Sequence, residues 1–491
     1  MTASPHAHAQ GHVHPPAAHP RRWTALALIC VAQFMLILDV TVVNVALPRM
    51  AADLDLTRTS LTWVVTAYTL CFGGLMLLGG RLADALGARR TLLAGLALFT
   101  AASLLSGLAT DGPTLIGGRV AQGVGAALLS PAALALVTTS FHGAERAKAL
   151  GAWAAVGGTG SAVGVLLGGA LTDGPGWPWI FYVNVPVGLA LLAALPRVVP
   201  PSAGTPARGL DLPGALLVTT GTGSLVYGLV QAGDTGWTSA STLLPLLGSV
   251  LLYGMFAAVE RASRAPLMDL RMFTLPQSSA GEVPPSRFAR PVVAGSFLML
   301  IATALLISFF FLGSVQLQHL SGFSAFETGL AFLPVAVTTA AGAHLGSRLV
   351  GSIGPRACAA GGMALAALGC LPLVLVTPGA DAWTTLVPAL SVASLGLGAV
   401  FVTATTTALG MIDHHEAGLA SGIVNTFHEV GGSIGVALVS TLAATSIQGS
   451  GTAGFTAAFT LCTLAATATA LAVPLLVPRG RPHTTGGPHV H

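Results

Sequence analysis

The chain has 491 residues, of which 53% are hydrophobic and 8% are charged, and its formal net charge is +4. Soluble domains carry about 25% charged residues, so this composition, with a mean hydropathy of +0.79, excludes an ordinary soluble protein. A helix needs about 20 mainly apolar residues to cross a bilayer, and such runs recur from residue 23 almost to the end. We therefore expect an all-α polytopic membrane protein, whose 61 glycines suit close packing of helices in lipid.

Residues 1–22 precede the first apolar run and lack the apolar core and cleavage site of a signal peptide. We interpret them as a disordered tail, as we do residues 478–491 at the other end of the chain. Both tails are rich in histidine: His6, His8, His12, His14, His19, His483, His489 and His491. A metal-binding tail is the alternative, but the irregular spacing and the absence of cysteine partners favour a tail without metal. We expect no metal site and no cofactor.

The apolar runs predict fourteen transmembrane helices. They lie near residues 23–47, 61–80, 91–109, 114–138, 148–171, 179–195, 213–231, 241–259, 291–316, 327–347, 357–376, 384–407, 418–446 and 453–477. The five cysteines, Cys30, Cys71, Cys358, Cys370 and Cys462, all lie in these runs without CxxC spacing, and we interpret them as small packing residues.

Basic residues indicate the orientation of the chain, because Lys and Arg collect in cytoplasmic loops. If the N-terminus is cytoplasmic, eighteen of the 21 basic residues lie on that side, Arg49 and Arg58 lie on the other, and Arg119 lies within a helix. An even number of spans returns the C-terminus to the cytoplasm. We expect a multi-pass protein of the plasma membrane, with both termini cytoplasmic.

The longest polar connection, residues 260–290, divides the chain into eight helices before it and six after it. The segment GRLADALGAR at 80–89 resembles SRLVGSIGPR at 347–356, and both follow a predicted span in the same direction. Parallel six-helix repeats are a known transporter plan, although chance similarity of two short loops is the alternative. We therefore expect a six-helix bundle at 23–195, two extra helices within 196–259, a cytoplasmic linker at 260–290 and a second bundle at 291–477.

Several segments resemble the major facilitator superfamily, and in particular its fourteen-helix drug:proton antiporters. They are GRLADALGARR at 80–90, LDVTVVNVALP at 38–48, WVVTAYTL at 63–70, RVAQGVGAA at 119–127, WPWIFYVNVPVG at 177–188, and the glycines Gly151, Gly160, Gly164, Gly168 and Gly169 of the antiporter motif. The resemblance covers nearly the whole chain. The chain departs from the family at Val165, where Pro is usual, at Pro178, where Arg is usual, and at His428 with Glu429, where relatives often have Arg-Gln.

Three charged residues lie well inside the predicted spans: Asp39, Arg119 and Glu429. A charge at the bilayer centre costs about 2.5–3.5 kcal/mol on insertion scales, so such residues face cavities or partners. Asp39 is the first candidate for proton binding, with Arg119 as its counter-charge and with Glu429 and His428 as a second proton-exchanging position. The alternatives are a static Asp39–Arg119 ion pair, an Arg119 anchored on carbonyl groups, and a Glu429 that is merely solvated.

The resemblance implies a conformational gate formed by Gly80, Asp84, Gly87, Arg89 and Arg90. In the family the Asp of this motif holds the two halves in the outward-facing state, and the positive N-terminal end of the helix near 418–421 is a suitable partner here. A surface salt bridge is the alternative for Asp84. The five antiporter-motif glycines allow close approach of helices that slide or rock, or serve packing alone.

A substrate cavity needs apolar walls and few polar groups. The candidates by depth and chemistry are Gln33, Phe34, Tyr68, Gln122, Phe309, Phe310, Gln316 and Asn425. GxxxxGK[ST], HExxH and GxSxG are absent, so the sequence predicts neither an ATPase nor a membrane enzyme. His414 and His415, with Asp413 and Glu416, form a short loop that we interpret as solvated.

The prediction is a monomeric, proton-coupled antiporter that exports amphipathic drugs or antibiotics, cationic ones among them, by alternating access. Its partners are the lipid bilayer, protons and a small organic substrate, and no nucleic acid. One alternative is a dedicated exporter of a single metabolite or self-made antibiotic. A more distant one is a non-transporting membrane sensor on the same scaffold.

Overall fold

The computed structural model describes residues 21–141, 143–201, 211–263, 266–268, 291–375, 381–409, 417–447 and 451–477. Every regular element within them is helical. This is the expected outcome for lipid-embedded backbone, because an isolated helix satisfies its own N–H and C=O groups. The histidine-rich tails, most of the 260–290 linker and the loop with His414 and His415 lie outside the described residues.

The first part of the chain forms α1 (Arg22–Asp53), α2 (Arg58–Leu86), α3 (Ala88–Gly107), α4 (Gly112–Ser140), α5 (Gly143–Asp173), α6 (Trp179–Tyr182) and α7 (Asn184–Val198). Two helices follow, α8 (Leu212–Thr235) and α9 (Ala240–Ala262). The last part forms α11 (Pro291–Val315) with the π-helical turn η1 (Gln316–Leu320), α12 (Ala325–Ile353), α13 (Pro355–Val374), the π-helical turn η2 (Ala382–Leu386) with α14 (Val387–Leu409), α15 (Ala417–Leu442), α16 (Ala444–Ile447) and α17 (Ala453–Leu476).

Twelve helical segments of the described residues are long and apolar enough to cross a membrane. They do not include α5 and α15, which are helices of 31 and 26 residues. Each predicted apolar run therefore contains one long helix. This is compatible with the predicted fourteen spans.

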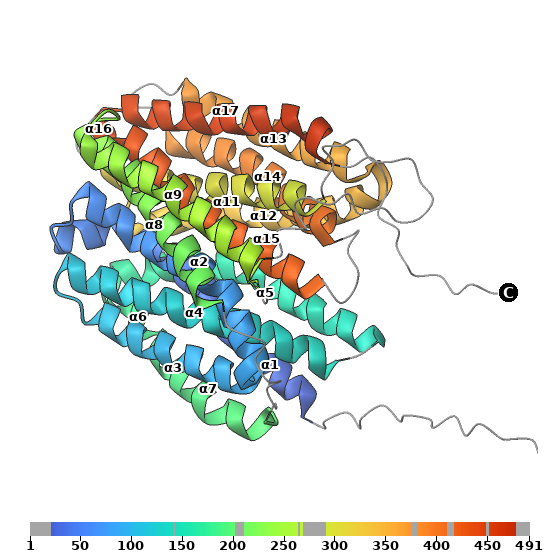
Figure 1. Cartoon of the computed structure of the whole chain (residues 1–491). Helices are drawn as coiled ribbons and strands as arrows, with labels where there is room; N and C mark the ends of the chain where they lie inside the picture. Colours follow the sequence, from blue (N-terminus) through green and yellow to red (C-terminus); the bar gives the residue numbers. More distant parts are fainter. Residues whose placement is uncertain are drawn as a thin grey trace, which may run out of the picture.

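The helices form two groups that face each other (Figure 1). One group contains α1 and α3–α7, and the other contains α11–α14 and α17, while α2 and α15 lie between them. The groups meet where α2 packs on α15 and where α5 packs on α12. We call the end of the bundle that carries Arg22, Leu86 and Leu476 the terminal end, and the end that carries Asp53, Asp173 and Ala325 the far end.

The two copies of the predicted repeat share one backbone conformation. The segment expected as a loop after α2 is helical as far as Leu86, and α12 likewise continues to Ile353. A single glycine then separates the helices, Gly87 with φ 93° and Gly354 with φ 85°. Side chains rarely adopt this region, so glycine is required at both positions. The loop prediction was wrong because one residue in this conformation is enough to reverse the chain.

The extra pair α8 and α9 crosses the front of the molecule, over the line where α2 meets α15 (Figure 1). At the far end Arg58 donates from Nε and Nη2 to Asp234 Oδ1 of α8, at 3.1 and 2.7 Å, and from Nη1 to Ser440 Oγ of α15 at 3.1 Å. One guanidinium thus joins three helices.

Burial of charge is more extensive than the sequence predicted. Arg58 is 4% exposed, and Asp211 and Glu260 at the terminal ends of α8 and α9 are also buried. The list of Asp39, Arg119 and Glu429 was therefore incomplete, and of these three Glu429 is only partly buried. The list left out charges at helix ends, but such a charge is exposed to solvent only if no neighbouring helix covers it.

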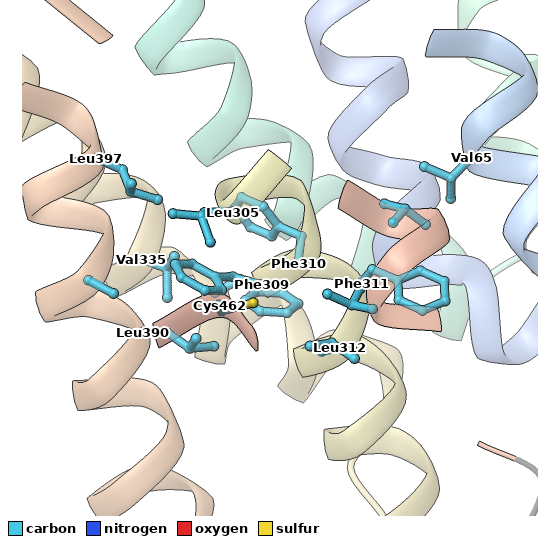
Figure 2. Packing of buried hydrophobic residues seen from close by; sticks show 14 of the residues in the cluster. Val65, Leu305, Phe309, Phe310, Phe311, Leu312, Val335, Leu390, Leu397 and Cys462 are labelled. Atoms are coloured by element: carbon cyan, nitrogen blue, oxygen red, sulfur yellow. The ribbon is translucent and has the colours of Figure 1, made fainter. Parts of the chain in front are cut away.

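The largest apolar cluster spans both groups. Figure 2 shows its centre, where Phe309, Phe310, Phe311 and Leu312 of α11 lie between Leu390 and Leu397 on one side and Val65 of α2 on the other. Cys462 is part of the same packing. All five cysteines are unpaired thiols; Cys358, Cys370 and Cys462 are buried, whereas Cys30 and Cys71 are partly exposed.

Candidate functional site

A cavity of about 1000 Å³ lies between the two groups of helices. Its walls come from α1, α2, α4 and α5 on one side and from α11, α12, α14 and α15 on the other. It extends from mid-depth, at Thr41 and Gly432, to the terminal end, at Asp84, Thr138 and Ala343. The lining is mainly apolar with a few polar groups, which is the usual character of a site for small organic molecules.

Three of the eight predicted cavity residues line this space, namely Gln33, Phe310 and Asn425. The other five, Phe34, Tyr68, Gln122, Phe309 and Gln316, lie outside the lining. Tyr68 and Gln122 are fully buried beside Arg119, and Phe309 is fully buried in the apolar cluster of Figure 2. Depth in the membrane was predictable for these residues, whereas the face of the helix on which each lies was not.

The far end of the cavity is closed by contacts between α5 and α12. A Cβ atom at Gly169 would lie 2.6 Å from the carbonyl oxygen of Ala325, so the two backbones touch there. Asp173 Oδ1 accepts from the Ala325 N–H at 3.2 Å, and Oδ2 accepts from the Phe326 N–H at 2.7 Å. A carboxylate of one group therefore caps the positive N-terminal end of a helix of the other group.

We expect Asp173→Asn to weaken this closure. The negative charge of a carboxylate at a helix N-terminus is worth about 0.3–1 kcal/mol, which corresponds to at most about a fivefold change in the ratio of two conformations. A single cysteine placed at Val45 should then react faster with a thiol reagent added from the far side, measured in a background without the native cysteines. Asp111→Asn is the matched control, because Asp111 caps α4 within one group by accepting from the Thr114 N–H at 2.8 Å. Equal labelling rates in the two variants would contradict the assignment.

Asp39 and Arg119 form a buried ion pair that is surrounded by hydrogen bonds to neighbouring helices. Each residue is 1% exposed. Arg119 donates from Nη1 to Asp39 and to Gln122 Oε1, and from Nε to the Val64 carbonyl at 3.0 Å. Asp39 Oδ1 accepts from Gln122 Nε2 at 3.0 Å and from Asn184 Nδ2 at 3.3 Å. The Arg119 guanidinium also lies over the Tyr68 ring, 4.3 Å from its centroid.

This pair lies outside the cavity lining. The pair and its partners belong to α1, α4 and α7 of one group and to the adjacent α2. Removal of one member of a buried, hydrogen-bonded ion pair leaves an uncompensated charge. The geometry suits the static ion pair that the sequence left open as the alternative.

Glu429 and His428 project from α15 into the cavity. Their side chains are 13% and 38% exposed, and Glu429 Oε1 lies 4.0 Å from His428 Nε2. Gly73 of α2 allows α15 to approach closely at Glu429, because a Cβ atom at Gly73 would lie 2.6 Å from Glu429 Cβ. One helical turn closer to the far end, Thr69 Oγ1 of α2 and Ser433 Oγ of α15 are 2.6 Å apart. The acid is thus accessible from the cavity and lies on the contact line between α2 and α15.

The residues predicted as a gate occupy the terminal end of α2 and the start of α3. Gly80 and Asp84 line the cavity, and Ser421 of α15 lines it opposite them. Arg89 donates to the Pro196 carbonyl at 2.8 Å, so it ties α3 to α7. Arg90 is exposed and Gly87 is the turn residue described above. The sequence had not suggested that Arg81 binds the segment after α9, where it donates to the Pro266 carbonyl at 2.5 Å.

The antiporter-motif glycines are not equivalent. Gly160, Gly164 and Gly168 share one face of α5 and touch α1, since a Cβ atom at each would approach Ile37, Thr41 or Val42. Gly169 touches α12, and Gly151 has open space around it. The helix runs unbroken through Val165, where the family's proline is absent.

Sequence reasoning missed Thr303, Asn184, Ser103 and Asp173, which bind His428, Asp39, Gln122 and the N-terminus of α12. No motif marks Thr303 or Ser103, and Asn184 lies in the segment 177–188 that resembles the family but had been given no role. A carboxylate at the end of an apolar run was a visible signal for Asp173. No group of three or more His, Cys, Asp or Glu side chains with metal-binding geometry occurs among the described residues.

Comparisons with known proteins agree with this geometry. Residues 29–436 match the sequence profile of the Major Facilitator Superfamily. The chain is 39% identical to the puromycin resistance protein pur8 of Streptomyces alboniger, over 86% of this chain and 82% of that protein. It is 38% identical to the cephamycin export protein CmcT of Amycolatopsis lactamdurans, over 88% of this chain and 86% of that protein.

Among solved structures, the peptide transporter POT in complex with sulfate has the same fold, with a TM-score of 0.63 at 15% identity. The match covers 92% of this chain and 94% of that chain. The helical architecture, the matched profile and the relatives lead to one conclusion: the chain belongs to the Major Facilitator Superfamily, and it is a membrane transport protein rather than an enzyme.

Proposed function

We propose that this protein is a proton-coupled antiporter that exports amphipathic organic molecules, cationic drugs or antibiotics among them, by alternating access. The observation that carries the proposal is a largely apolar cavity between two helical groups, closed at its far end, with the Glu429 carboxylate in its wall. The relatives named for puromycin resistance and cephamycin export support the substrate class.

The terminal end of the bundle is cytoplasmic in this proposal. The distribution of basic residues supports it, since eighteen of 21 lie on that side. Both termini are then cytoplasmic, the membrane is the plasma membrane, and the described conformation faces inward with the cavity open to the cytoplasm. The protein acts as a monomer, because each chain contains a whole cavity.

Glu429 is the acid that carries the transported proton, which moves in exchange for the substrate. Its carboxylate is in the cavity wall, whereas the Asp39–Arg119 pair is enclosed by its own hydrogen bonds. A carboxylate that binds either a proton or a cationic substrate, but not both, couples the two movements in opposite directions. Asp39 remains the alternative proton carrier, in which case the ion pair must open during transport.

Asp84 holds the outward-facing state in this scheme. It lies at the wide terminal end of the cavity on α2, opposite Ser421 near the start of α15. Closure of that end brings the carboxylate towards the positive N-terminal end of α15, as Asp173 already meets α12 at the far end.

The test is proton flux in proteoliposomes that contain purified protein and a pH-sensitive dye. Addition of puromycin, an amphipathic amine, to the side with the open cavity should release protons in proportion to the puromycin transported. Protein-free liposomes and liposomes with a collapsed pH gradient are the controls. Puromycin movement that is independent of the pH gradient would overturn proton coupling and leave transport in place.

A dedicated exporter of one metabolite is the second candidate, and the relative named as a cephamycin export protein favours it. Competition separates the two. If unrelated amphipathic amines compete with puromycin, the protein has broad specificity, whereas competition by a single compound indicates a dedicated exporter. If the protein moves no solute at all, the result would support the more distant alternative, a non-transporting membrane sensor.

A further inference from the structure

We propose that Thr303 is a positioning residue for proton exchange, which places the imidazole proton of His428 on Nε2 so that this N–H faces Glu429. The proposal rests on the proposed transport function and deepens it. It begins from one hydrogen bond between α11 and α15, in which Thr303 Oγ1 and His428 Nδ1 are 2.8 Å apart.

Among the described residues, the Thr303 hydroxyl bonds to a side chain of another helix and not to a carbonyl of its own helix. Most threonines in these helices donate to a carbonyl one turn earlier, as Thr339 does to Val335 and Thr403 does to Ala399, each at 2.8 Å. Thr303 is 2% exposed, and His428 is its hydrogen-bond partner among the described residues. A buried hydroxyl needs an acceptor for its proton, and Nδ1 is the acceptor within reach.

This requirement selects the tautomer. If Thr303 donates to Nδ1, that nitrogen carries no proton and the neutral imidazole has its proton on Nε2. The opposite arrangement would make Nδ1 the donor and leave the hydroxyl proton buried without a partner. Met299 Sδ lies 3.4 Å from Nδ1, but a thioether is a weak acceptor and does not compensate for this loss.

The ring is held in place from two other helices. Met299 and Thr303 contact it from α11. The centroid of the Phe401 ring of α14 lies 5.7 Å from the centroid of the imidazole, and the two ring planes make an angle of 53°. Nε2 is then directed to the Glu429 side, 4.0 Å from Oε1, a distance that one water molecule or a small rotation of the carboxylate can bridge. Thr303, His428 and Glu429 thus form a line of donor and acceptor groups.

The charged surroundings of this line are simple. Glu429 is the titratable neighbour on α15, and Tyr68 of α2, buried beside Arg119, interacts electrostatically with Glu429. The helices α11 and α14 contribute Met299, Thr303 and Phe401, which do not titrate. In the described cavity lining, Arg81 and Asp84 are the other charged groups, and both lie at the terminal end of α2. A change in proton exchange after mutation of Thr303 would therefore report on His428 and Glu429.

The experiment uses full-length protein with 15N-labelled histidine in lipid nanodiscs, in which 15N chemical shifts distinguish protonated from unprotonated ring nitrogens. Subtraction of the His428→Asn spectrum identifies the His428 signals. Wild type should show a protonated Nε2 and an unprotonated Nδ1. Thr303→Val should lose this preference and Thr303→Ser should keep it. Thr403→Val is the matched control, since Thr403 is a buried threonine that bonds within its own helix.

Puromycin-driven proton flux in proteoliposomes gives the functional reading. We expect Thr303→Val to shift the midpoint of the pH dependence by about half a pH unit or more. A shift of this size corresponds to the free energy of one hydrogen bond between neutral groups. Thr303→Ser should restore the wild-type profile. A wild-type spectrum with the proton on Nδ1, or a Thr303→Val protein with the wild-type spectrum and profile, would overturn the proposal. A wild-type protein with the expected tautomer but without puromycin-driven flux would instead count against the proposed transport.

Discussion

Arg119→Ala should lower the free energy of unfolding by about 3–5 kcal/mol, because it leaves the Asp39 carboxylate buried and without a counter-charge. The variant also leaves Gln122 Oε1 and the Val64 carbonyl oxygen without the hydrogen bonds that Arg119 donates to them. The measurement is reversible unfolding in mixed micelles, followed by the near-UV signal of the tryptophans. A large loss of folded protein during expression would have the same cause.

Arg49→Ala is the matched control. Arg49 also pairs with an aspartate, Asp53, at 3.8 Å, but its side chain is 66% exposed. Exposed pairs contribute at most about 1 kcal/mol, so this variant should unfold close to wild type. Equal stability of the Arg119→Ala and wild-type proteins would show that the buried pair is not a structural unit.

The double variant Asp39→Asn with Arg119→Gln separates structure from proton coupling. It removes both charges, so part of the lost stability should return. If its puromycin-driven proton flux persists, Asp39 is not the proton carrier. If the flux disappears while the protein remains folded, the pair must open during transport and Asp39 exchanges the proton.

Glu429→Gln should abolish puromycin-driven proton flux and raise the KM for puromycin by about tenfold or more. Two opposite charges 4 Å apart interact by about 4 kcal/mol at an effective dielectric constant of 20, and about 1.4 kcal/mol of this, after desolvation, corresponds to the tenfold change. Proton flux is measured as dye-reported proton release at several pH values, and the KM is measured separately as uptake of radiolabelled puromycin at several concentrations. The glutamine keeps the size of the side chain, so folding should be little affected.

Glu327→Gln is a suitable control for the loss of a carboxylate. Glu327 is exposed at the far end, where it accepts from the Ser324 N–H at 2.8 Å as part of a helix cap. Its substitution should leave the KM and the pH profile unchanged. A Glu429→Gln protein with the wild-type pH profile would return the proton-carrying role to Asp39.

The helices were predictable because lipid leaves the chain few choices. Each apolar run that we identified holds one long helix, and Gly87 and Gly354 end α2 and α12 at matched positions. The pairing of Asp39 with Arg119 was also predictable, since two opposite charges buried in neighbouring spans lower their energy by contact. These predictions depend on residue chemistry alone.

Other features depend on rotation and contact between distant helices, and the sequence contains no signal for them. Phe309 and Phe310 are adjacent and equally apolar, yet Phe310 lines the cavity and Phe309 does not. Thr303 and His428 are 125 residues apart, and nothing in either segment indicates that they meet. Arg58 was predicted only to lie on the side opposite to the N-terminus, and its burial under α8 arises from packing that the sequence does not indicate.

The position of α8 and α9 has a consequence for how a substrate enters from the membrane. Thr441 donates to the Leu229 carbonyl at 2.6 Å, Arg58 joins α2, α8 and α15, and Val226 and Val230 of α8 pack on Ala437 of α15. A compound dissolved in the bilayer would have to displace this hairpin in order to pass between α2 and α15. Lateral access to Glu429 from that side is therefore blocked, and a lipid-dissolved substrate must arrive through the opposite side of the cavity or from the aqueous phase.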